Sequence, residues 1–200
     1  MVGNWPVGRA GQKRRDERRE AIVAAALRLF IERGALPVRV EDIAAEVGIS
    51  RATFYKYFSE RDEILAELFG RLLATAPPGP RTDGPVAERL ITLLAGTADR
   101  MLEQEQLARF VYSLPVRHDA LLGGEVSQPA FMAAVDALVA EGTSTGELRD
   151  DLPTALLTGH IVRAFEAALR DWAAGRAGDA HAHVVRVVDL ALNGCRPTSP

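Results

Sequence analysis

Residues 40–58 read Val-Glu-Asp-Ile-Ala-Ala-Glu-Val-Gly-Ile-Ser-Arg-Ala-Thr-Phe-Tyr-Lys-Tyr-Phe. This pattern predicts two short helices, at about 40–47 and 51–58, joined by a tight turn. Gly48 tolerates the positive φ angle that such a turn requires. The Ser50 hydroxyl is placed to accept a hydrogen bond from an unpaired N–H at the start of the second helix. The segment is therefore expected to form a helix-turn-helix, whose second helix enters the major groove of DNA.

Apolar residues of this segment are expected to hold the two helices together and against a third helix. Ala44 is small, which the close approach of two helix backbones requires. The side chains expected to face inward, against a preceding helix that ends in Phe30, are Ile43, Val47, Ile49, Phe54 and Phe58. The motif is thus predicted to be part of a three-helix domain.

The outward face of the second helix carries residue types that suit contact with DNA. At about 100° per residue, Ala52 and Lys56 lie opposite the aromatic core, with Thr53 and Tyr55 beside them. Arg51 is in the first turn, where a recognition helix reaches base edges. Arginine binds guanine O6 and N7 with two hydrogen bonds, and lysine and tyrosine suit phosphates. The alternative is a helical hairpin with exposed Tyr and Lys and no ligand.

The rest of the chain is also periodic in the manner of helices, and no segment alternates convincingly as a strand does. The Pro- and Gly-rich stretch 77–85 predicts a loop. Further helices are predicted at Glu20–Arg33, Asp62–Ala76, Val86–Glu105, Gln106–Leu114, Pro129–Glu141, Leu152–Ala174 and Ala180–Leu192. The expected fold is all-α with about nine helices, in an N-terminal three-helix helix-turn-helix domain and a larger C-terminal helical domain.

Charge is distributed unevenly along the 200 residues. The formal net charge of −3 argues, on its own, against a nucleic-acid partner. Residues 1–61, however, contain 12 Lys/Arg and 8 Asp/Glu, a net charge of +4, whereas residues 62–200 contain 12 and 19, a net charge of −7. This asymmetry predicts that the N-terminal part meets a polyanion. The basic run at 12–19 is expected to belong to a flexible arm over residues 1–18, followed by domains at 19–66 and 67–200.

Composition and motifs exclude several classes of protein. With 48% hydrophobic residues the chain can bury a core, but no apolar run reaches the length of about 18 residues that a membrane span needs. The N-terminus lacks the apolar stretch of a secretory signal. The single cysteine, Cys195, rules out an internal disulfide and fits a reducing compartment, so we expect a cytoplasmic protein with no membrane partner.

Neither a metal site nor a catalytic site is expected. His181 and His183 are two residues apart and do not share a helix face, and no third ligand is nearby. The sequence shows no nucleophile triad, P-loop or dinucleotide-binding glycine motif. We therefore expect no cofactor and no enzymatic activity.

Several short motifs resemble the DNA-binding domain of TetR-family transcriptional regulators. The resemblance covers about residues 19–70. It rests on Glu20-Ala21-Ile22 through Leu29-Phe30, Glu32-Arg33-Gly34, Asp42-Ile43-Ala44, Val47-Gly48-Ile49-Ser50, Thr53-Phe54-Tyr55, Tyr57-Phe58 and Arg61-Asp62. The C-terminal portion is similar to the family more loosely, because Gly146–Pro153 leads into a long helix that ends near Trp172.

The resemblance implies roles for single side chains in DNA binding. Arg39 stands in a stretch where the family places Thr or Ser, and its charge could replace a hydroxyl–phosphate contact. Glu41 stands where some relatives have a base-reading cation, and would contact a base only by accepting from cytosine N4. The arm around 14–19 would lie near the DNA backbone or in the minor groove. The candidate DNA-contacting residues are Arg39, Ser50, Arg51, Ala52 and Thr53 (the last three at base edges), Tyr55, Lys56 and Tyr57 (bases or phosphates) and Arg61 (a phosphate).

The resemblance also implies a homodimer in which the last two helices, at 152–174 and 180–192, form a four-helix bundle between subunits. The residues expected to allow close approach or to add apolar area are Gly159, Ala164, Ala167, Ala168, Val184, Val187, Val188 and Leu192. The alternative is that these residues pack inside one subunit. Two-fold symmetry would require a palindromic operator on double-stranded DNA.

The remaining helices of the C-terminal domain are expected to enclose an apolar cavity for a small effector. Candidate lining residues are Met101, Phe110, Tyr112, His118, Phe131, His160, Arg163, Phe165 and Trp172. His160 and Arg163 lead this set because they are polar groups on a mostly apolar helix. The effector would favour a state in which the reading helices are wrongly spaced for DNA, which describes a repressor. Control by a protein partner and, more distantly, a helical enzyme are the alternatives.

Overall fold

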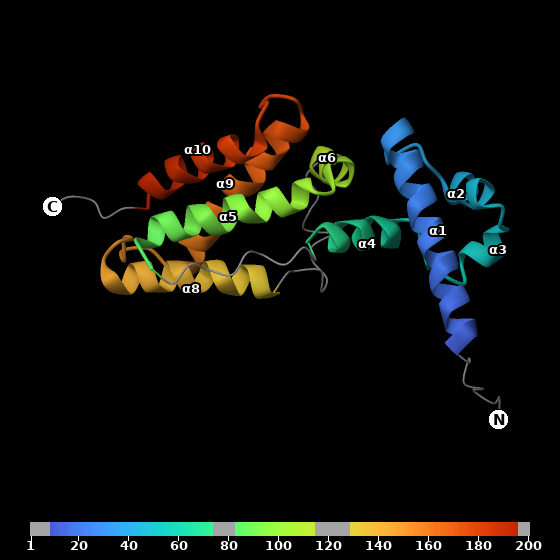
Figure 1. The fold of residues 1–200 in the computed structure, drawn as a ribbon, viewed down its shortest axis with the longest axis horizontal. Coiled ribbons are helices and arrows are strands. Elements are labelled where there is room, and N and C mark those ends of the chain that lie inside the picture. The colour runs from blue at the N-terminus through green and yellow to red at the C-terminus, as the bar shows by residue number, and fades with distance from the viewer. Residues whose placement is uncertain (1–8, 74–82, 115–128, 196–200) are drawn as a thin grey trace. The chain divides into compact units, whose positions relative to one another are not determined.

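The structure, a computed structural model, describes residues 9–73, 83–114 and 129–195, which form nine helices and no strand (Figure 1). The all-α prediction is therefore confirmed. The chain divides into two compact units, Met1–Leu68 and Phe69–Pro200. This division falls inside the helix Asp62–Leu73 (α4), two residues beyond the predicted boundary after residue 66. No helix in the described ranges combines the length and the apolar character that crossing a membrane would require.

The N-terminal unit is built on the long helix Arg9–Arg33 (α1). Helices Val40–Val47 (α2) and Arg51–Phe54 (α3) lie on one side of α1, as Figure 1 shows. Its core consists of Ile22, Val23, Ala26, Leu29, Phe30, Ile43, Ala44, Phe54, Phe58, Ile64 and Leu68, all buried. Of the five motif residues expected to face inward, Ile43, Phe54 and Phe58 are buried, whereas Val47 and Ile49 are only half-buried.

Helix α1 begins at Arg9, eleven residues earlier than the predicted start at Glu20. Residues 9–18, expected to be flexible, are therefore helical, and residues 1–8 of the predicted arm lie outside the described residues. The segment consists largely of good helix formers. Side chains four residues apart also interact, with 2.9 Å between Gln12 Nε2 and Asp16 Oδ1 and 3.8 Å between Lys13 Nζ and Glu17 Oε1.

Helix α3 is shorter than predicted, because it ends at Phe54 and not at residue 58. The next residues tighten into a turn with i→i+3 hydrogen bonds, from Lys56 N to Thr53 O at 3.2 Å and from Tyr57 N to Phe54 O at 2.9 Å. This turn brings Phe58 back into the core, where its ring centroid lies 5.8 Å from that of Phe54.

The C-terminal unit, here called the body, contains the helices Val86–Leu102 (α5), Glu105–Ser113 (α6), Pro129–Thr145 (α8), Thr154–Ala173 (α9) and Ala180–Asn193 (α10). Helix α9 packs against α6, α8 and α10, and α5 packs against α8 and α10. The predicted loop at 77–85 lies outside the described residues up to position 82.

Helix α8 continues past Gly142, where the sequence predicts its end, and stops at Thr145 before Gly146, whose φ is +77°. Gly142 is needed for packing and not for termination. A β-carbon at this position would lie 2.8 Å from Leu148 Cδ1 and 3.1 Å from Val86 Cγ1. The glycine therefore lets the end of α8 approach its neighbours closely.

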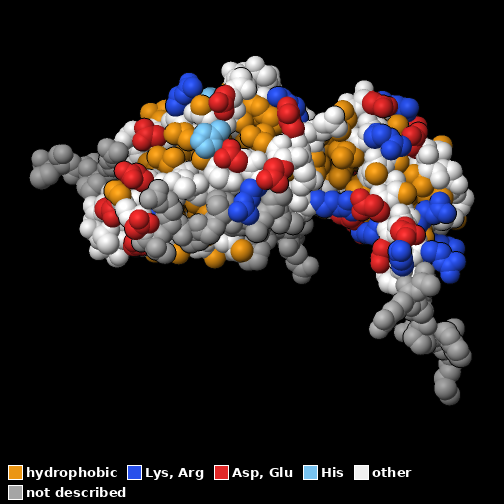
Figure 2. Space-filling view, in the orientation of Figure 1, with side chains coloured by type: hydrophobic (Ala, Val, Ile, Leu, Met, Phe, Trp, Pro, Cys, Tyr) orange, Lys and Arg blue, Asp and Glu red, His pale blue; other side chains and the backbone are white. Residues whose placement is uncertain are grey.

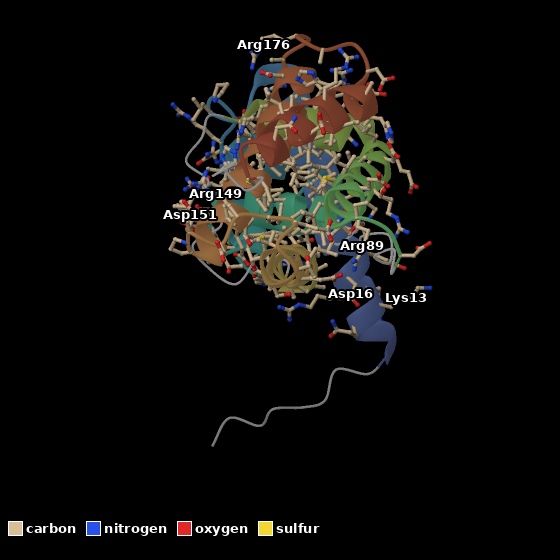
Figure 3. All side chains as sticks on the ribbon, turned by 90° about the vertical axis from the view of Figure 1, so that its left-hand side faces the viewer. Lys13, Asp16, Arg89, Arg149, Asp151 and Arg176 are labelled. Atoms are coloured by element: carbon tan, nitrogen blue, oxygen red, sulfur yellow. The ribbon has the colours of Figure 1, made fainter. Side chains whose placement is uncertain are left out.

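Ion pairs at the surface connect elements of the body (Figure 3). Arg89 on α5 binds Glu141 on α8 through two hydrogen bonds, of 2.5 and 3.0 Å, and this guanidinium holds the pKa of Glu141 below its usual value. Arg149 binds Asp151 at 2.6 Å and lowers the pKa of that carboxyl. The Arg149 backbone N–H also donates to Cys195 O at 2.8 Å, which fastens the end of α10.

Candidate nucleic-acid interface

The turn between α2 and α3 has the geometry that the sequence predicts. Gly48 adopts φ 69° and ψ 39°, in the left-handed region, and its N–H donates to Ala44 O and Ala45 O. Ala44 is buried at the point where the two helices meet. The Ser50 hydroxyl accepts from Thr53 N at 3.1 Å, so Ser50 caps α3 as expected.

One surface of α3 and the following turn displays most of the predicted DNA-contacting residues. Arg51, Ala52, Tyr55 and Lys56 are exposed, and Thr53 and Tyr57 are half-buried. Phe54, between them in sequence, is fully buried and meets the Tyr55 ring edge-on at 5.6 Å. The buried ring thus fixes the rotation of the short helix, and with it the direction of the exposed residues.

An ion pair connects the two helices of the motif at this surface. Arg51 Nη1 lies 3.0 Å from Glu41 Oε1 on α2, and both side chains are mostly exposed. The sequence predicted that Glu41 stands close to the base-reading position but did not reveal this pair. The reading arginine of the predicted site is therefore held by a carboxylate of α2.

Arg61, expected to bind a phosphate, has a structural role in the N-terminal unit. Its Nη1 donates to Ala35 O at 2.7 Å and to Val38 O at 3.1 Å, and its Nη2 donates to Asp62 Oδ1 at 2.8 Å. These bonds hold the loop before α2 against the start of α4. Arg39, at the start of α2, is exposed.

Arg19 is a structural residue of the interface that sequence reasoning missed. It donates to Tyr57 O and to Glu67 Oε2, both at 2.6 Å, and its guanidinium lies 4.1 Å from the centroid of the Phe58 ring. These contacts join α1, the turn after α3 and α4. Arg19 belongs to the basic run 12–19, and the sequence did not distinguish it from the other arginines of that run. Only its position, three residues before the buried Ile22, set it apart.

Most of the predicted effector-binding residues form the apolar interior of the body. Met101, Phe110, Tyr112, Phe131, Phe165 and Trp172 are buried. The Tyr112 hydroxyl lies 3.6 Å from Met101 Sδ, and burial raises the pKa of this phenol. The rings of Phe131 and Phe165 are 5.9 Å apart. One buried hydroxyl, Thr158 Oγ1 on α9, has no hydrogen-bond partner among the described residues.

Two of the leading effector-binding predictions do not fit this interior. His160 and Arg163 are exposed, because they lie on the face of α9 opposite the buried Ile161 and Phe165. Their side chains therefore lie outside the apolar interior of the body, and a contact with an effector stays a prediction. His118 lies outside the described residues.

The residues expected between subunits divide into two groups. Ala168, Val184, Val188 and Leu192 are buried inside the body, so for these four the alternative of packing within one subunit holds. Gly159, Ala164, Ala167 and Val187 retain exposed area. Two large apolar side chains that were not predicted, Leu156 at 49% and Leu190 at 72% exposure, lie on α9 and α10.

The histidines of α10 are engaged separately. His181 Nδ1 lies 2.9 Å from Asp99 Oδ1, and His183 Nε2 lies 3.4 Å from Asp171 Oδ2. Across the described parts of the chain, no cluster of three or more His, Cys, Asp or Glu residues is arranged to hold a metal ion.

Comparison with known proteins agrees with this geometry. The family of bacterial regulatory proteins, tetR family, matches residues 22–68. The HTH-type transcriptional regulator EthR of Mycolicibacterium smegmatis is 39% identical over 64 residues, which cover 32% of this chain and 30% of that protein. The likeness to EthR is thus limited to less than a third of its length.

Two solved structures resemble the whole chain. The fatty acid degradation regulator FadR from Bacillus halodurans has a TM-score of 0.68 and 25% identity, over 88% of this chain and 95% of that chain. FadR from Bacillus subtilis, solved in complex with stearoyl-CoA, has a TM-score of 0.64, 19% identity and coverage of 88% and 99%, and shows the fold alone. The helix-turn-helix geometry and the family match over the same residues identify residues 22–68 as a DNA-binding domain of the tetR family type, and the solved structures share the all-helical fold of the chain.

Proposed function

We propose that this protein is a transcriptional regulator of the TetR family, a homodimeric repressor that binds a palindromic operator through α3 and leaves it when a long-chain acyl-CoA binds the body. The observation that carries the proposal is the exposed surface of the Ser50-capped α3 and the turn after it, which presents Arg51, Ala52, Tyr55 and Lys56. A helix of this kind in the major groove reads bases from its first turn and reaches phosphates from its end.

Each exposed residue type has a chemical counterpart in DNA. The Arg51 guanidinium matches guanine O6 and N7, and the methyl group of Ala52 suits a thymine methyl. Lys56 and Tyr55 suit backbone phosphates. Arg51 is therefore the residue on which base preference should depend most, because a bidentate pair discriminates against a wrong base by about 1–3 kcal/mol.

The exposed face of α9 and α10 supports a dimer. Leu156 and Leu190 offer apolar area there, and the Arg163 guanidinium lies over Gly159, 3.3 Å from where a β-carbon would stand. Burial of side chains as apolar and as exposed as these two leucines would favour packing of α9 and α10 against a partner. His160 and Arg163, which do not line the interior, would then face the partner subunit. Isologous association through this face would produce the two-fold symmetry that a palindromic operator requires.

The chemistry of the body supports an acyl-chain effector. Its interior contains buried methionine and aromatic side chains from α5, α6, α8 and α9, and side chains of these types suit contact with a long hydrocarbon chain. The unpartnered hydroxyl of Thr158 could donate to a thioester or carboxyl oxygen. FadR from Bacillus subtilis, which shares this fold, was solved with stearoyl-CoA. Because α4 runs across the division between the two units, it is the element through which we propose that binding is coupled to the reading helix.

The DNA-binding part of the proposal is tested with two matched variants. Arg51 and Arg28 each pair with a glutamate of α2, at 3.0 and 2.8 Å, and both pairs are exposed. We expect Arg51→Ala to lose affinity for a duplex selected from a random library, by about tenfold or more, while Arg28→Ala binds as the wild type does. Equal binding by the wild type and Arg51→Ala, measured by fluorescence anisotropy, would show that α3 does not read the operator in this way.

The effector is tested on the same duplex. Addition of stearoyl-CoA should release the wild-type protein, whereas coenzyme A without an acyl chain should not. Analytical ultracentrifugation of the wild type and of Leu190→Glu should give a dimer and a monomer, respectively. Release by neither compound would refute the proposed effector class without affecting the assignment of α3.

A further inference from the structure

We infer that the N-terminal turns of α1 and the turn after α3 form a preformed binding site for a phosphate of the DNA backbone, beside the reading helix. The inference rests on the proposed function and adds a second, base-independent contact to it. Its starting point is a hollow of about 370 Å³ lined by Gly11, Arg14, Arg15, Arg18, Lys56 and Tyr57.

The α1 side of the hollow is a single stripe along the helix. Gly11, Arg14, Arg15 and Arg18 are spaced i, i+3, i+4 and i+7, which places them on one face. The spacing places these residues on one face only because α1 is helical from Arg9. In a flexible arm the same arginines would have no common direction, so the folded extension is what gathers them.

Two arginines hold the stripe against the turn after α3. Arg15 Nη2 donates to Lys56 O at 3.4 Å, and its guanidinium lies 6.0 Å from the centroid of the Tyr57 ring. One helical turn further on, Arg19 donates to Tyr57 O at 2.6 Å. The two sides of the hollow are therefore joined before any ligand arrives, which reduces the ordering cost of binding.

The lining is strongly positive. It contains three arginines and one lysine and no carboxylate. The acidic residues of the same run interact with other neighbours, since Asp16 accepts from Gln12 and Glu17 pairs with Lys13. Lys13 and Asp16 are labelled on α1 in Figure 3, and Figure 2 shows the blue side chains that gather on the N-terminal unit. Guanidinium groups bind phosphate oxygens in pairs, which makes an oxyanion of this type the expected ligand.

The width of helix α1 favours contact with the DNA backbone over entry into the minor groove. An α-helix with its side chains is about 10–12 Å across, whereas the minor groove is only about 6 Å wide. The helical part of the extension therefore cannot enter that groove as an extended arm would. Lys56 and Tyr57 belong to the turn that begins after α3 with Tyr55, so a duplex read by α3 would bring its flanking phosphates next to the hollow.

The experiment compares Arg18→Ala with Lys13→Ala. Each substitution removes one positive charge from the same part of α1, but only Arg18 lines the hollow. For wild type and variants, the affinity is measured against salt concentration on the selected duplex and on one of scrambled sequence. Arg18→Ala should reduce the slope of log K against log[salt] by about 0.9, the value for one phosphate contact, on both duplexes. Its base preference should stay unchanged, and Lys13→Ala should keep the wild-type slope.

The outcomes separate this inference from the proposed function. If Arg18→Ala and Lys13→Ala lower the slope equally, the arginines act only through net charge and the inference is overturned. If wild type prefers no sequence, the operator proposal fails, while the slope on the scrambled duplex still decides the phosphate site. As a measurement without DNA, titration with inorganic phosphate should shift the Nε–H NMR signals of Arg14 and Arg18 but not that of Arg28; equal shifts in all three would overturn the inference.

Discussion

The Arg61 guanidinium supplies hydrogen bonds that the short loop between α1 and α2 cannot make with its own side chains. The loop between α1 and α2 contains few residues with side-chain donors, and its carbonyl oxygens at Ala35 and Val38 would otherwise need water. Arg61 donates to both, and its side chain is only 22% exposed. These bonds are strong because their donor is charged. Their loss leaves two partly buried carbonyl oxygens without partners.

Substitution Arg61→Ala is therefore expected to destabilise the DNA-binding unit by about 1.5–3 kcal/mol, the usual value of hydrogen bonds to a charged group. Urea denaturation followed by circular dichroism measures the change. Arg28→Ala is the control, because Arg28 belongs to an exposed ion pair worth at most about 1 kcal/mol. An unchanged midpoint in Arg61→Ala would mean that Arg61 serves DNA contact alone.

Helix boundaries show what the sequence could and could not predict. The left-handed Gly48 and the capping Ser50 were predicted because their roles are local and belong to the residue type. The start of α1 was missed because a basic run is also typical of a disordered arm, and the contacts of Arg15 and Arg19 with carbonyl oxygens about forty residues away cannot be read from the sequence. The end of α8 was predicted wrongly for a similar reason, because Gly142 serves a tertiary contact and not a turn.

Gly142→Ala should destabilise the body by about 1–3 kcal/mol, because the added methyl group overpacks the contact with Leu148 and Val86. Gly178→Ala is the matched control in the same unit, since a β-carbon at Gly178 meets nothing within 4 Å. Differential scanning calorimetry compares the two variants. A gain in stability for Gly142→Ala would show that the close approach of α8 is not as tight as described.

The whole molecule combines a basic reading unit with an acidic body. Figure 2 shows red side chains spread over the body, whose residues 69–200 contain 12 Lys/Arg and 16 Asp/Glu, a net charge of −4. The charge asymmetry and the reading surface were both predictable, because they follow from composition and from one short motif. The outward direction of the His160 and Arg163 side chains was not predictable from the sequence. A helix with apolar residues on two faces does not show which face is covered within the subunit and which remains for a partner.

Acid should weaken the body through its paired carboxylates. Arginine partners hold the pKa values of Glu141, Asp151 and Asp171 below their unfolded values. A group with a lowered folded pKa stabilises the protein above its unfolded pKa, about 4, and this stabilisation is lost as pH falls through the folded value. The melting temperature of the body, measured by calorimetry, should therefore fall below pH 4, and Glu141→Gln should flatten this fall.

The pKa of Glu166 is shifted in the opposite direction, so this residue serves as the control in the same series of melting measurements. Burial raises its pKa, so its ionised form costs stability at neutral pH, and this cost disappears as pH falls through the raised value. Glu166→Gln should accordingly raise the melting temperature at pH 7 and leave it unchanged in acid. A Glu166→Gln variant that is less stable than wild type at pH 7 would contradict this account.

The pairing of Arg51 with Glu41 bears on how fast the protein finds its target. A reading arginine with an exposed anionic partner gives up a pair worth at most about 1 kcal/mol whenever it contacts a duplex, so a random sequence retains the protein for a shorter time. Guanine, which offers two acceptors, compensates for the loss of Glu41 better than other bases do. We expect the pair to act as a competitor inside the protein, which shortens each unproductive stop during the search along the chromosome.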